Sequence, residues 1–322
     1  MTDTTILDRP KKARLTWIAR VPGVAVMLVV LLALFGVMSP GFGTSANLSN
    51  VLVQSAILLI IALAMTLIIM TEGIDLSMGA LLTLATIIYA ATLLASGSFV
   101  MALAAALALG IAFGFLNGWL IAVADIPPFV TTLGTLGVAQ GLSLIVTDGQ
   151  SIVGLPRSVQ FAYAGTVLGI PFPVIVAVVC YFLCYWLLYQ TRFGIGISAL
   201  GGNREALRQA GVNDKLMLIA VYVLGGVAAA IAAPLLCARM NSAHPTAAIG
   251  MEFDAIAAVA LGGTQFERGN GWLFGTVLGV ITIGVLRNGL NLLAVPSSVQ
   301  VACVGFLVIV ALFLDGLRSK GT

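Results

Sequence analysis

Charged side chains are scarce in this sequence. Asp, Glu, Lys and Arg make up 8% of its 322 residues, whereas soluble domains carry about 25%. Hydrophobic residues make up 60%, and the mean hydropathy is +1.12. No charged side chain occurs in residues 21–71 or in residues 76–124. Apolar runs of this length leave almost nothing for a soluble domain and predict an all-α polytopic membrane protein.

Residues that commonly act in catalysis or bind metal ions, such as histidine and cysteine, are also few. The chain has one histidine, His244, and no Ser/His/Asp constellation at plausible depth, so an intramembrane enzyme is the least favoured class. The four cysteines lie in apolar runs without metal-ligand partners nearby and are expected to be small buried hydrophobes: Cys180, Cys184, Cys237 and Cys303. No lysine follows a glycine, which excludes the G-x-x-x-x-G-K-[ST] phosphate loop.

The apolar runs divide into ten predicted spans. Turn residues at 39–50 and 96–98 separate the first four spans, and Pro127-Pro128 suit the start of the fifth. The remaining spans are predicted at about 171–189, 216–238, 253–266, 271–287 and 297–314. The eighth span, 253–266, reaches only about 21 Å as a helix, so it is tilted, re-entrant or longer upstream.

The basic residues fix the predicted orientation. On this span map the cytoplasm receives twelve of the fifteen basic residues, which satisfies the positive-inside rule with both termini inside. The outside receives Arg157, Arg239 and Arg287. The expected organisation is a cytoplasmic tail at 1–20, one transmembrane domain at 21–315 that includes a cytoplasmic loop at 190–215, and a cytoplasmic tail at 316–322. The first span lacks an A-x-A site and is expected to stay uncleaved.

A short internal repeat suggests inverted halves. FGFLNGWLIAVADIPPF at 113–129 resembles IGVLRNGLNLLAVPSSV at 283–299, and the two segments close spans four and nine. Because five spans separate them, they have opposite orientations, which predicts an inverted 5+5 repeat of the kind common in transporters.

The longest polar stretch on the cytoplasmic side, residues 190–215, is expected to hold a short helix. Asn203 can cap it, Glu205 suits its first turn and Gly211 suits its end. Flanking glycines at 194, 196, 201 and 202 are expected to let the helix turn away from the neighbouring spans. The stretch is either an ordinary basic loop or a docking helix for a cytoplasmic partner, with these candidate residues: Gly202, Asn203, Arg204, Glu205, Leu207, Arg208 and Gly211.

Four blocks in the same order resemble the permeases of ribose/xylose/arabinose-type ABC sugar importers. They are EGIDLSMGA (72–80), GGNREALRQAGV (201–212), EFDAIAAVALGGT (252–264) and LRNGLNLL (286–293). The resemblance implies a bacterial inner-membrane permease that pairs with a second copy or a paralogue. It also implies an ATPase dimer inside, which would bind ATP and Mg²⁺, and a periplasmic sugar-binding protein outside.

This sequence departs from the family pattern at three places. Glu72 stands where the family usually has Gly, Leu207 stands where Ala is common, and QFERGNG at 265–271 replaces a Ser/Gly-rich run. The first change adds a charge near the membrane, where it could alter the pathway or the substrate.

Glu72 and Asp75 interrupt the apolar runs, and an isolated charge in hydrocarbon is costly. Asp75 or Ser77 can cap span three, or else they form a polar element at the inner mouth of a pathway. Glu72 has no evident capping role. Asn117 either lines the pathway or forms an interhelical hydrogen bond. The expected inner-mouth group is therefore Glu72, Asp75, Ser77 and Asn117.

Several residues are placed on the outer side. Glu252 and Asp254 are expected either to cap span eight or, with Arg239, to face a binding protein. Arg287 is expected to snorkel at the membrane edge, and His244 to be a solvated loop residue. Gly110, Gly114 and Gly118 recur at a spacing of four on span four, which predicts close helix packing.

The sequence therefore favours a sugar-import permease driven by a separate ATPase. The chain itself would be a transport subunit and not an enzyme, with no cofactor or metal of its own and no nucleic-acid partner. The alternative is an ion-coupled secondary transporter that uses Glu72 and Asp75, which an inverted repeat would fit equally well.

Overall fold

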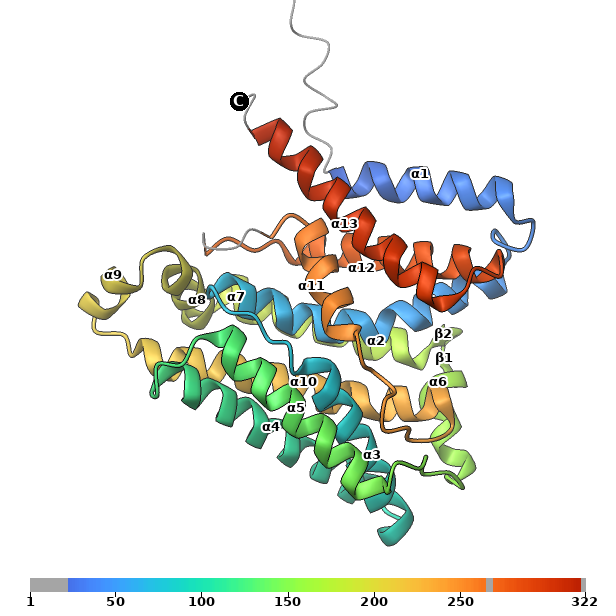
Figure 1. The fold of residues 1–322 in the computed structure, drawn as a ribbon, viewed down its shortest axis with the longest axis horizontal. Helices are drawn as coiled ribbons and strands as arrows, with labels where there is room; N and C mark the ends of the chain where they lie inside the picture. The colour runs from blue at the N-terminus through green and yellow to red at the C-terminus, as the bar shows by residue number, and fades with distance from the viewer. Residues whose placement is uncertain (1–22, 265–268, 320–322) are drawn as a thin grey trace, which may run out of the picture.

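The computed structural model describes residues 23–264 and 269–319. Nearly all of its elements are helices, joined by one short hairpin and by loops (Figure 1). In chain order they are α1 (Gly23–Met38), α2 (Ser45–Met70), α3 (Met78–Ser96), α4 (Phe99–Ala122), α5 (Pro128–Thr147), η2 (Arg157–Gln160), α6 (Phe161–Ala164), β1 (Thr166–Val167), β2 (Ile170–Pro171), α7 (Phe172–Gln190), α8 (Arg192–Gly202), α9 (Arg204–Gln209), α10 (Asp214–Met240), α11 (Met251–Leu261), α12 (Leu273–Leu292) and α13 (Ser297–Ser319).

Seven helices in the described ranges are long and apolar enough to cross a membrane: α2, α3, α4, α5, α7, α10 and α12. Two shorter apolar helices, Gly23–Met38 and Ser297–Leu307, flank this set. The prediction of an all-α polytopic membrane protein is confirmed at this level. The sequence-based helix positions also agree with the observed ones, whereas the tail at 1–20 lies outside the described residues.

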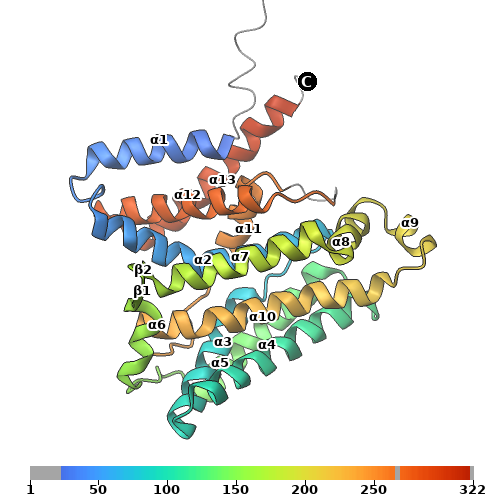
Figure 2. The same cartoon turned by 180° about the vertical axis from the view of Figure 1, so that it is seen from behind.

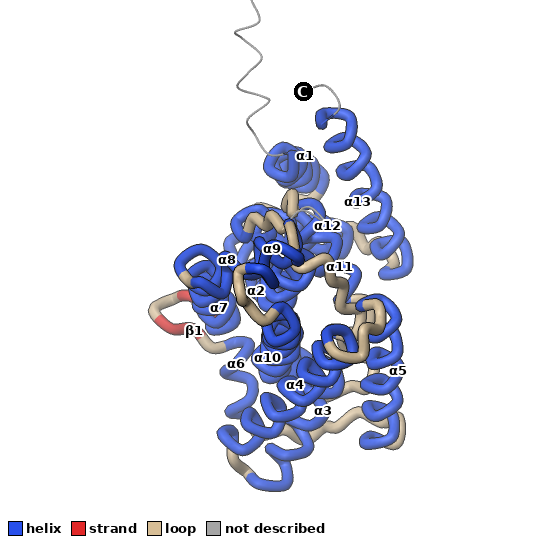
Figure 3. The backbone as a smooth tube through the Cα atoms, turned by 90° about the vertical axis from the view of Figure 1, so that its left-hand side faces the viewer, coloured by secondary structure: helices blue, strands red, loops and turns tan. Residues whose placement is uncertain are grey.

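Helix α2, whose membrane-length window has the highest mean hydropathy of the seven long helices, forms the centre of the molecule. Its membrane-length window is 83% buried, whereas the corresponding windows of α4, α5 and α7 are 28% buried or less. Helices α7, α10, α11 and α12 surround α2, and Figure 3 looks along this bundle from one end. A helix that is apolar all round must be buried in protein or lipid, so α2 takes the protein interior and the outer helices offer apolar faces to lipid.

Helices α4 and α10 pack against each other along much of their length (Figure 2). A Cβ atom on Gly110 would meet the backbone of Gly226, and Gly114 and Gly118 likewise face the backbone of α10. The prediction that this glycine series serves close helix packing is confirmed.

A small outer element was not predicted from the sequence. Strands β1 and β2 form an antiparallel hairpin, with φ of 54° at Leu168 and 79° at Gly169. Two positive φ values in a two-residue loop are the signature of a type I′ turn. The hairpin lies with η2 and α6 at one end of the long helices, and α8 and α9 lie at the other end (Figure 1).

Helices α3 and α11 both begin inside the molecule. A Cβ atom on Gly79 would meet the Glu252 carboxylate, and the backbone N–H of Ala248 donates to the Thr83 hydroxyl at 3.1 Å. The segment 241–250 therefore runs back from the end of α10 to the start of α3 before α11 begins. We call residues 241–250 the re-entrant segment. Its irregular backbone is tolerated because protein surrounds it.

Candidate functional site

A buried chain of polar side chains begins in the segment between α2 and α3. The Asp75 carboxylate accepts from the backbone N–H of Ser77 at 2.8 Å and from its hydroxyl at 2.6 Å. Asn117 on α4 donates to the Ser77 hydroxyl at 3.0 Å, and Thr135 on α5 donates to the Asn117 carbonyl at 2.7 Å. All four side chains are buried. The chain of bonds therefore holds the non-helical segment 71–77 against α4 and α5.

The structure brings three of the four expected inner-mouth residues together: Asp75, Ser77 and Asn117. Thr135 was missed, although the threonines at 131, 132 and 135 form a polar stripe on an otherwise apolar helix. Ser77 occupies the N-cap position of α3 but makes no side-chain cap hydrogen bond. The capping prediction is therefore wrong in detail, because Asp75 closes the turn before the helix instead of binding an N–H group inside it.

Replacing Asp75 by Ala is expected to destabilise the fold by about 1–3 kcal/mol, because the buried Ser77 N–H and hydroxyl would lose their acceptor. Asp75→Asn keeps an accepting oxygen and is expected to stay close to the wild-type protein. Thermal unfolding of the purified variants measures this difference. Equal destabilisation by Asn and Ala would show that the negative charge itself is required.

Glu72 does not join this polar chain. It is exposed and has φ of 63°. Its N–H donates to the Ile69 carbonyl at 3.1 Å and the Gly73 N–H donates to the Ile68 carbonyl at 3.1 Å. This is the Schellman pattern that ends a helix, and its left-handed residue is usually glycine. The backbone thus explains why glycine suits this position in the related permeases.

Glu72→Gly is expected to keep uptake normal and to stabilise the helix end by up to about 1 kcal/mol, because the left-handed strain disappears. Glu72→Gln is the matched control, since it removes the charge and keeps the strain. Thermal unfolding and uptake measure the two effects. Loss of uptake in both variants at normal expression would assign a transport role to the carboxylate.

The short helix expected in the 190–215 stretch is present as α9. The Asn203 side chain accepts from the Ala206 N–H at 2.9 Å, and Gly211 ends the helix with φ of 77°. Glu205 lies in the first turn and is exposed, whereas Leu207 is buried. The predicted cap and stop are confirmed, whereas the burial of Leu207 was not predicted and removes this side chain from the surface that a partner could meet.

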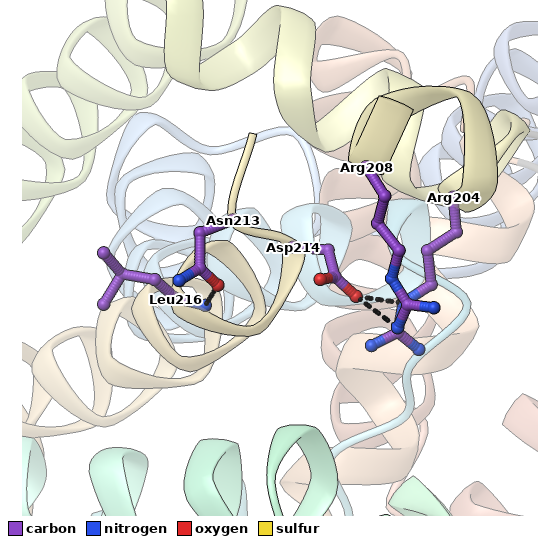
Figure 4. A network of polar contacts seen from close by, with 5 residues as sticks. All are labelled: Arg204, Arg208, Asn213, Asp214 and Leu216. Carbon is purple, nitrogen blue, oxygen red and sulfur yellow. Dashed lines mark hydrogen bonds and ion pairs between the residues drawn. The ribbon is translucent and has the colours of Figure 1, made fainter. Parts of the chain in front are cut away.

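The two arginines of α9 bind an aspartate of their own chain. Arg204 Nε donates to Asp214 Oδ2 at 2.6 Å, and Arg208 Nη2 donates to the same oxygen at 2.9 Å (Figure 4). Hydrogen bonding and charge from Asp214 raise the pKa of Arg208. Their guanidinium groups therefore fix α9 to the start of α10 and are not free docking charges. Asp214 was missed, although it follows the helix-capping Asn213 and is, after Glu205, the acid nearest the two arginines in the sequence.

The glycines before α9 serve packing and not a change of direction. They belong to a helix, α8, that was not predicted. A Cβ atom on Gly194 would meet the Leu188 backbone, and one on Gly201 would meet the Met70 carbonyl. Gly202 is exposed at the end of α8. The prediction that these glycines let the short helix turn away from the neighbouring spans is therefore wrong, since α8 packs tightly against the ends of α2 and α7.

The residues assigned to the outer face divide into two groups. Arg239 is exposed in the last turn of α10, but Glu252 and Asp254 are only 3% and 8% exposed. Glu252 accepts from the Gly250 N–H at 3.1 Å, and Asp254 pairs with Arg287 at 2.7 Å. The prediction that Glu252 and Asp254 face a partner is therefore wrong, because Glu252 is buried against the start of α3 and Asp254 is buried against Arg287 of α12.

Two further residues complete this outer region. Arg287 does not snorkel, since its guanidinium group binds Asp254 instead. His244 is exposed and accepts from the Thr246 N–H at 3.2 Å, which confirms a loop residue. No group of three or more His, Cys, Asp or Glu side chains that could hold a metal ion occurs within 23–264 and 269–319.

Comparisons with known proteins identify the family. Residues 47–312 match the family described as branched-chain amino acid transport system / permease component. The chain is 38% identical over 294 residues to the ribose import permease protein of Bacillus subtilis (strain 168), with 91% of each chain covered. It is 36% identical over 300 residues to the D-allose transport system permease protein of Escherichia coli (strain K12), with 92% of each covered.

A third relative is the galactose/methyl galactoside import permease protein of Salmonella typhimurium (strain LT2), 36% identical over 332 residues and covering 96% of this chain and 97% of the relative. No solved structure matches. The family match covers most of the chain, including the polar chain at 75–135 and the arginine pair of α9. The protein is therefore a membrane permease and belongs to the branched-chain amino acid transport system / permease component family.

Proposed function

We propose that this chain is the inner-membrane permease subunit of an ABC importer for a monosaccharide or related polyol. The observation that carries the proposal is the near-complete coverage of relatives named as permeases for ribose, allose and galactose import or transport. The chain forms the pathway and is not itself an enzyme. The same relatives give no support to the ion-coupled secondary transporter.

The partners follow from this role. A periplasmic binding protein delivers the sugar, and a cytoplasmic ATPase dimer binds ATP and Mg²⁺ and supplies the energy. A second permease chain, identical or paralogous, completes the pathway. Closure of the ATPase dimer moves α9. The pathway between the paired permeases then closes on one side of the membrane and opens on the other.

The surface left on α9 suits this coupling. Arg204 and Arg208 are bonded to Asp214 although their side chains are 40% and 48% exposed, and Glu205 and Gln209 are exposed beside them on α9. Exposed Val212 and Leu216 lie beside them. A partner ATPase would therefore meet polar and apolar side chains held in place by the Asp214 contact.

The finer architecture proposed is ten spans in an inverted 5+5 repeat, with α8 and α9 on the cytoplasmic side. The packing supports it: α4 lies along α10 as α12 lies along α2, and α3 and α11 both begin inside the molecule. The two repeated Asn-Gly pairs also correspond. Asn117 bonds to Ser77, and Asn288 exchanges hydrogen bonds with Asn47 at 2.9 Å, both in buried positions.

The test is purification of the chain from its native membrane in mild detergent, followed by an ATPase assay. A co-purifying ATPase subunit and vanadate-sensitive hydrolysis, stimulated by the loaded binding protein, are expected. Uptake of D-ribose, D-allose and D-galactose into proteoliposomes then identifies the sugar. A chain that purifies alone and takes up sugar with an ion gradient and no ATP would contradict the proposal.

A further inference from the structure

A cavity with a volume of about 630 Å³ lies along helix α11. Helices α2, α10, α12 and α13 form its other walls, and residues from Met251 to Ala260 line it on the α11 side. The volume falls within the range of about 300–1,000 Å³ that small-molecule sites occupy. The exposed side chains of Ile249, Phe253 and Val301 lie at its open side.

The polar groups of the cavity offer both donors and acceptors. Gln54 and Ser55 come from α2, and the ion pair of Asp254 and Arg287 joins α11 to α12. Arg287 Nη2 lies 2.7 Å from Asp254 Oδ2, so the two charges compensate each other. Arg239 adds one more guanidinium group from the last turn of α10, where it is exposed. The remaining lining is mostly apolar.

Part of this polar capacity is unused by the protein. The Ser55 hydroxyl and the Arg287 Nε atom are buried and have no hydrogen-bond partner among the described residues. Buried polar atoms in native proteins are almost always partnered. Gly284 on α12 packs closely on the Ser55 hydroxyl, because a Cβ atom there would meet that oxygen. The walls of the cavity therefore retain hydrogen-bonding capacity on α2 and α12.

We propose that this cavity holds the transported sugar within a single permease chain, as a neutral ring with several hydroxyl groups. This inference rests on the proposed function. A hydroxyl group both donates and accepts, so it can serve Asp254, Gln54 and the guanidinium groups, while its C–H faces contact the apolar walls. An anion would meet the Asp254 carboxylate and a cation would meet two arginines, so a neutral polyol fits the lining best.

Filling the cavity tests the inference. Gly305 lines it from α13, and a Cβ atom there would have nothing within 4 Å. Gly36 on α1 has equally open surroundings, does not line the cavity and is the matched control. In proteoliposomes with the ATPase and binding protein, Gly305→Phe is expected to lower uptake about tenfold. ATP hydrolysis stimulated by the loaded binding protein should persist, and Gly36→Phe should transport normally.

A labelling experiment covers the case in which Gly305→Phe disturbs assembly. Ile249→Cys, in a chain whose four native cysteines are replaced by Ala, is treated with N-ethylmaleimide in the assembled transporter. The sugar that the wild-type protein transports, at twice its dissociation constant, should slow labelling about threefold. Leu168→Cys on the hairpin, 97% exposed in the native chain, should label at the same rate with and without sugar.

The outcomes separate the two proposals. If the chain purifies alone and takes up sugar with an ion gradient and no ATP, both the proposed function and this inference are overturned. If wild-type protein takes up one of D-ribose, D-allose and D-galactose but Gly305→Phe behaves like Gly36→Phe, and Ile249→Cys is not protected, only the cavity assignment fails. Protection of Ile249→Cys by inorganic phosphate and not by sugar would also overturn the assignment, because it indicates an anion site.

Discussion

Asp214→Ala is expected to lower sugar uptake about tenfold while leaving the amount of protein in the membrane unchanged. Asp214 Oδ2 accepts from Arg204 at 2.6 Å and from Arg208 at 2.9 Å, and in the described residues both arginines have this one acidic partner. Without the carboxylate, α9 keeps its Asn203 cap but loses its attachment to α10. Movement of the ATPase would then no longer be passed to the membrane helices. Uptake and ATP hydrolysis measured on the same proteoliposomes reveal this uncoupling.

The single arginine variants provide a graded comparison. Arg204→Ala and Arg208→Ala each remove one of the two bonds, so each should lose less uptake than Asp214→Ala. Asp214→Asn is the matched control, since it keeps the shape of the side chain and an oxygen that can accept from the two arginines. If Asp214→Ala transports at the wild-type rate, α9 does not need this attachment, and coupling must pass through α8 instead.

Gly110→Val is expected to prevent correct assembly of the bundle. A Cβ atom at Gly110 would meet the carbonyl of Gly226, so α4 and α10 would have to separate. Overpacking a tight contact costs about 1–3 kcal/mol, and this contact is between two backbones that cannot rotate away. The expected result is loss of the monodisperse detergent-solubilised protein, measured by size-exclusion chromatography and thermal unfolding.

Gly137→Val on α5 is the matched control for this prediction. It places the same β-branched side chain in the middle of a membrane-length helix, where a Cβ atom has nothing within 4 Å. The control should yield folded protein. Normal yield and stability of Gly110→Val would mean that α4 and α10 tolerate a wider spacing than the structure shows.

The sequence predicted the helices well because apolar periodicity and length govern them. Charge-free runs and turn residues located every long helix, and the four-residue spacing of glycines identified the α4 face that packs on α10. The end of α9 was equally predictable, since Asn203 and Gly211 act through local backbone geometry.

Contacts between distant parts of the chain were not predictable in this way. Asp254 and Arg287 lie 33 residues apart, and the sequence placed both at an exposed edge. Their pairing depends on the re-entrant course of 241–250, which no local pattern indicates. Helix α8 was missed because its four glycines suggest a turn and not a helix, yet their missing side chains allow close packing.

The shortness of α11 has a consequence for how the protein is made. Its eleven residues extend about 16 Å as a helix, roughly half the hydrocarbon thickness. A nascent segment of this length, with Glu252 and Asp254 in its first turn, is poorly suited to partition into lipid from the insertion machinery by itself. It must enter after α2 and α12 are in place, because they provide its protein surroundings and the Arg287 partner for Asp254. Biogenesis of this permease therefore has an obligatory late step. Helix α12, which is synthesised after α11, must be in place before α11 is integrated into the bilayer.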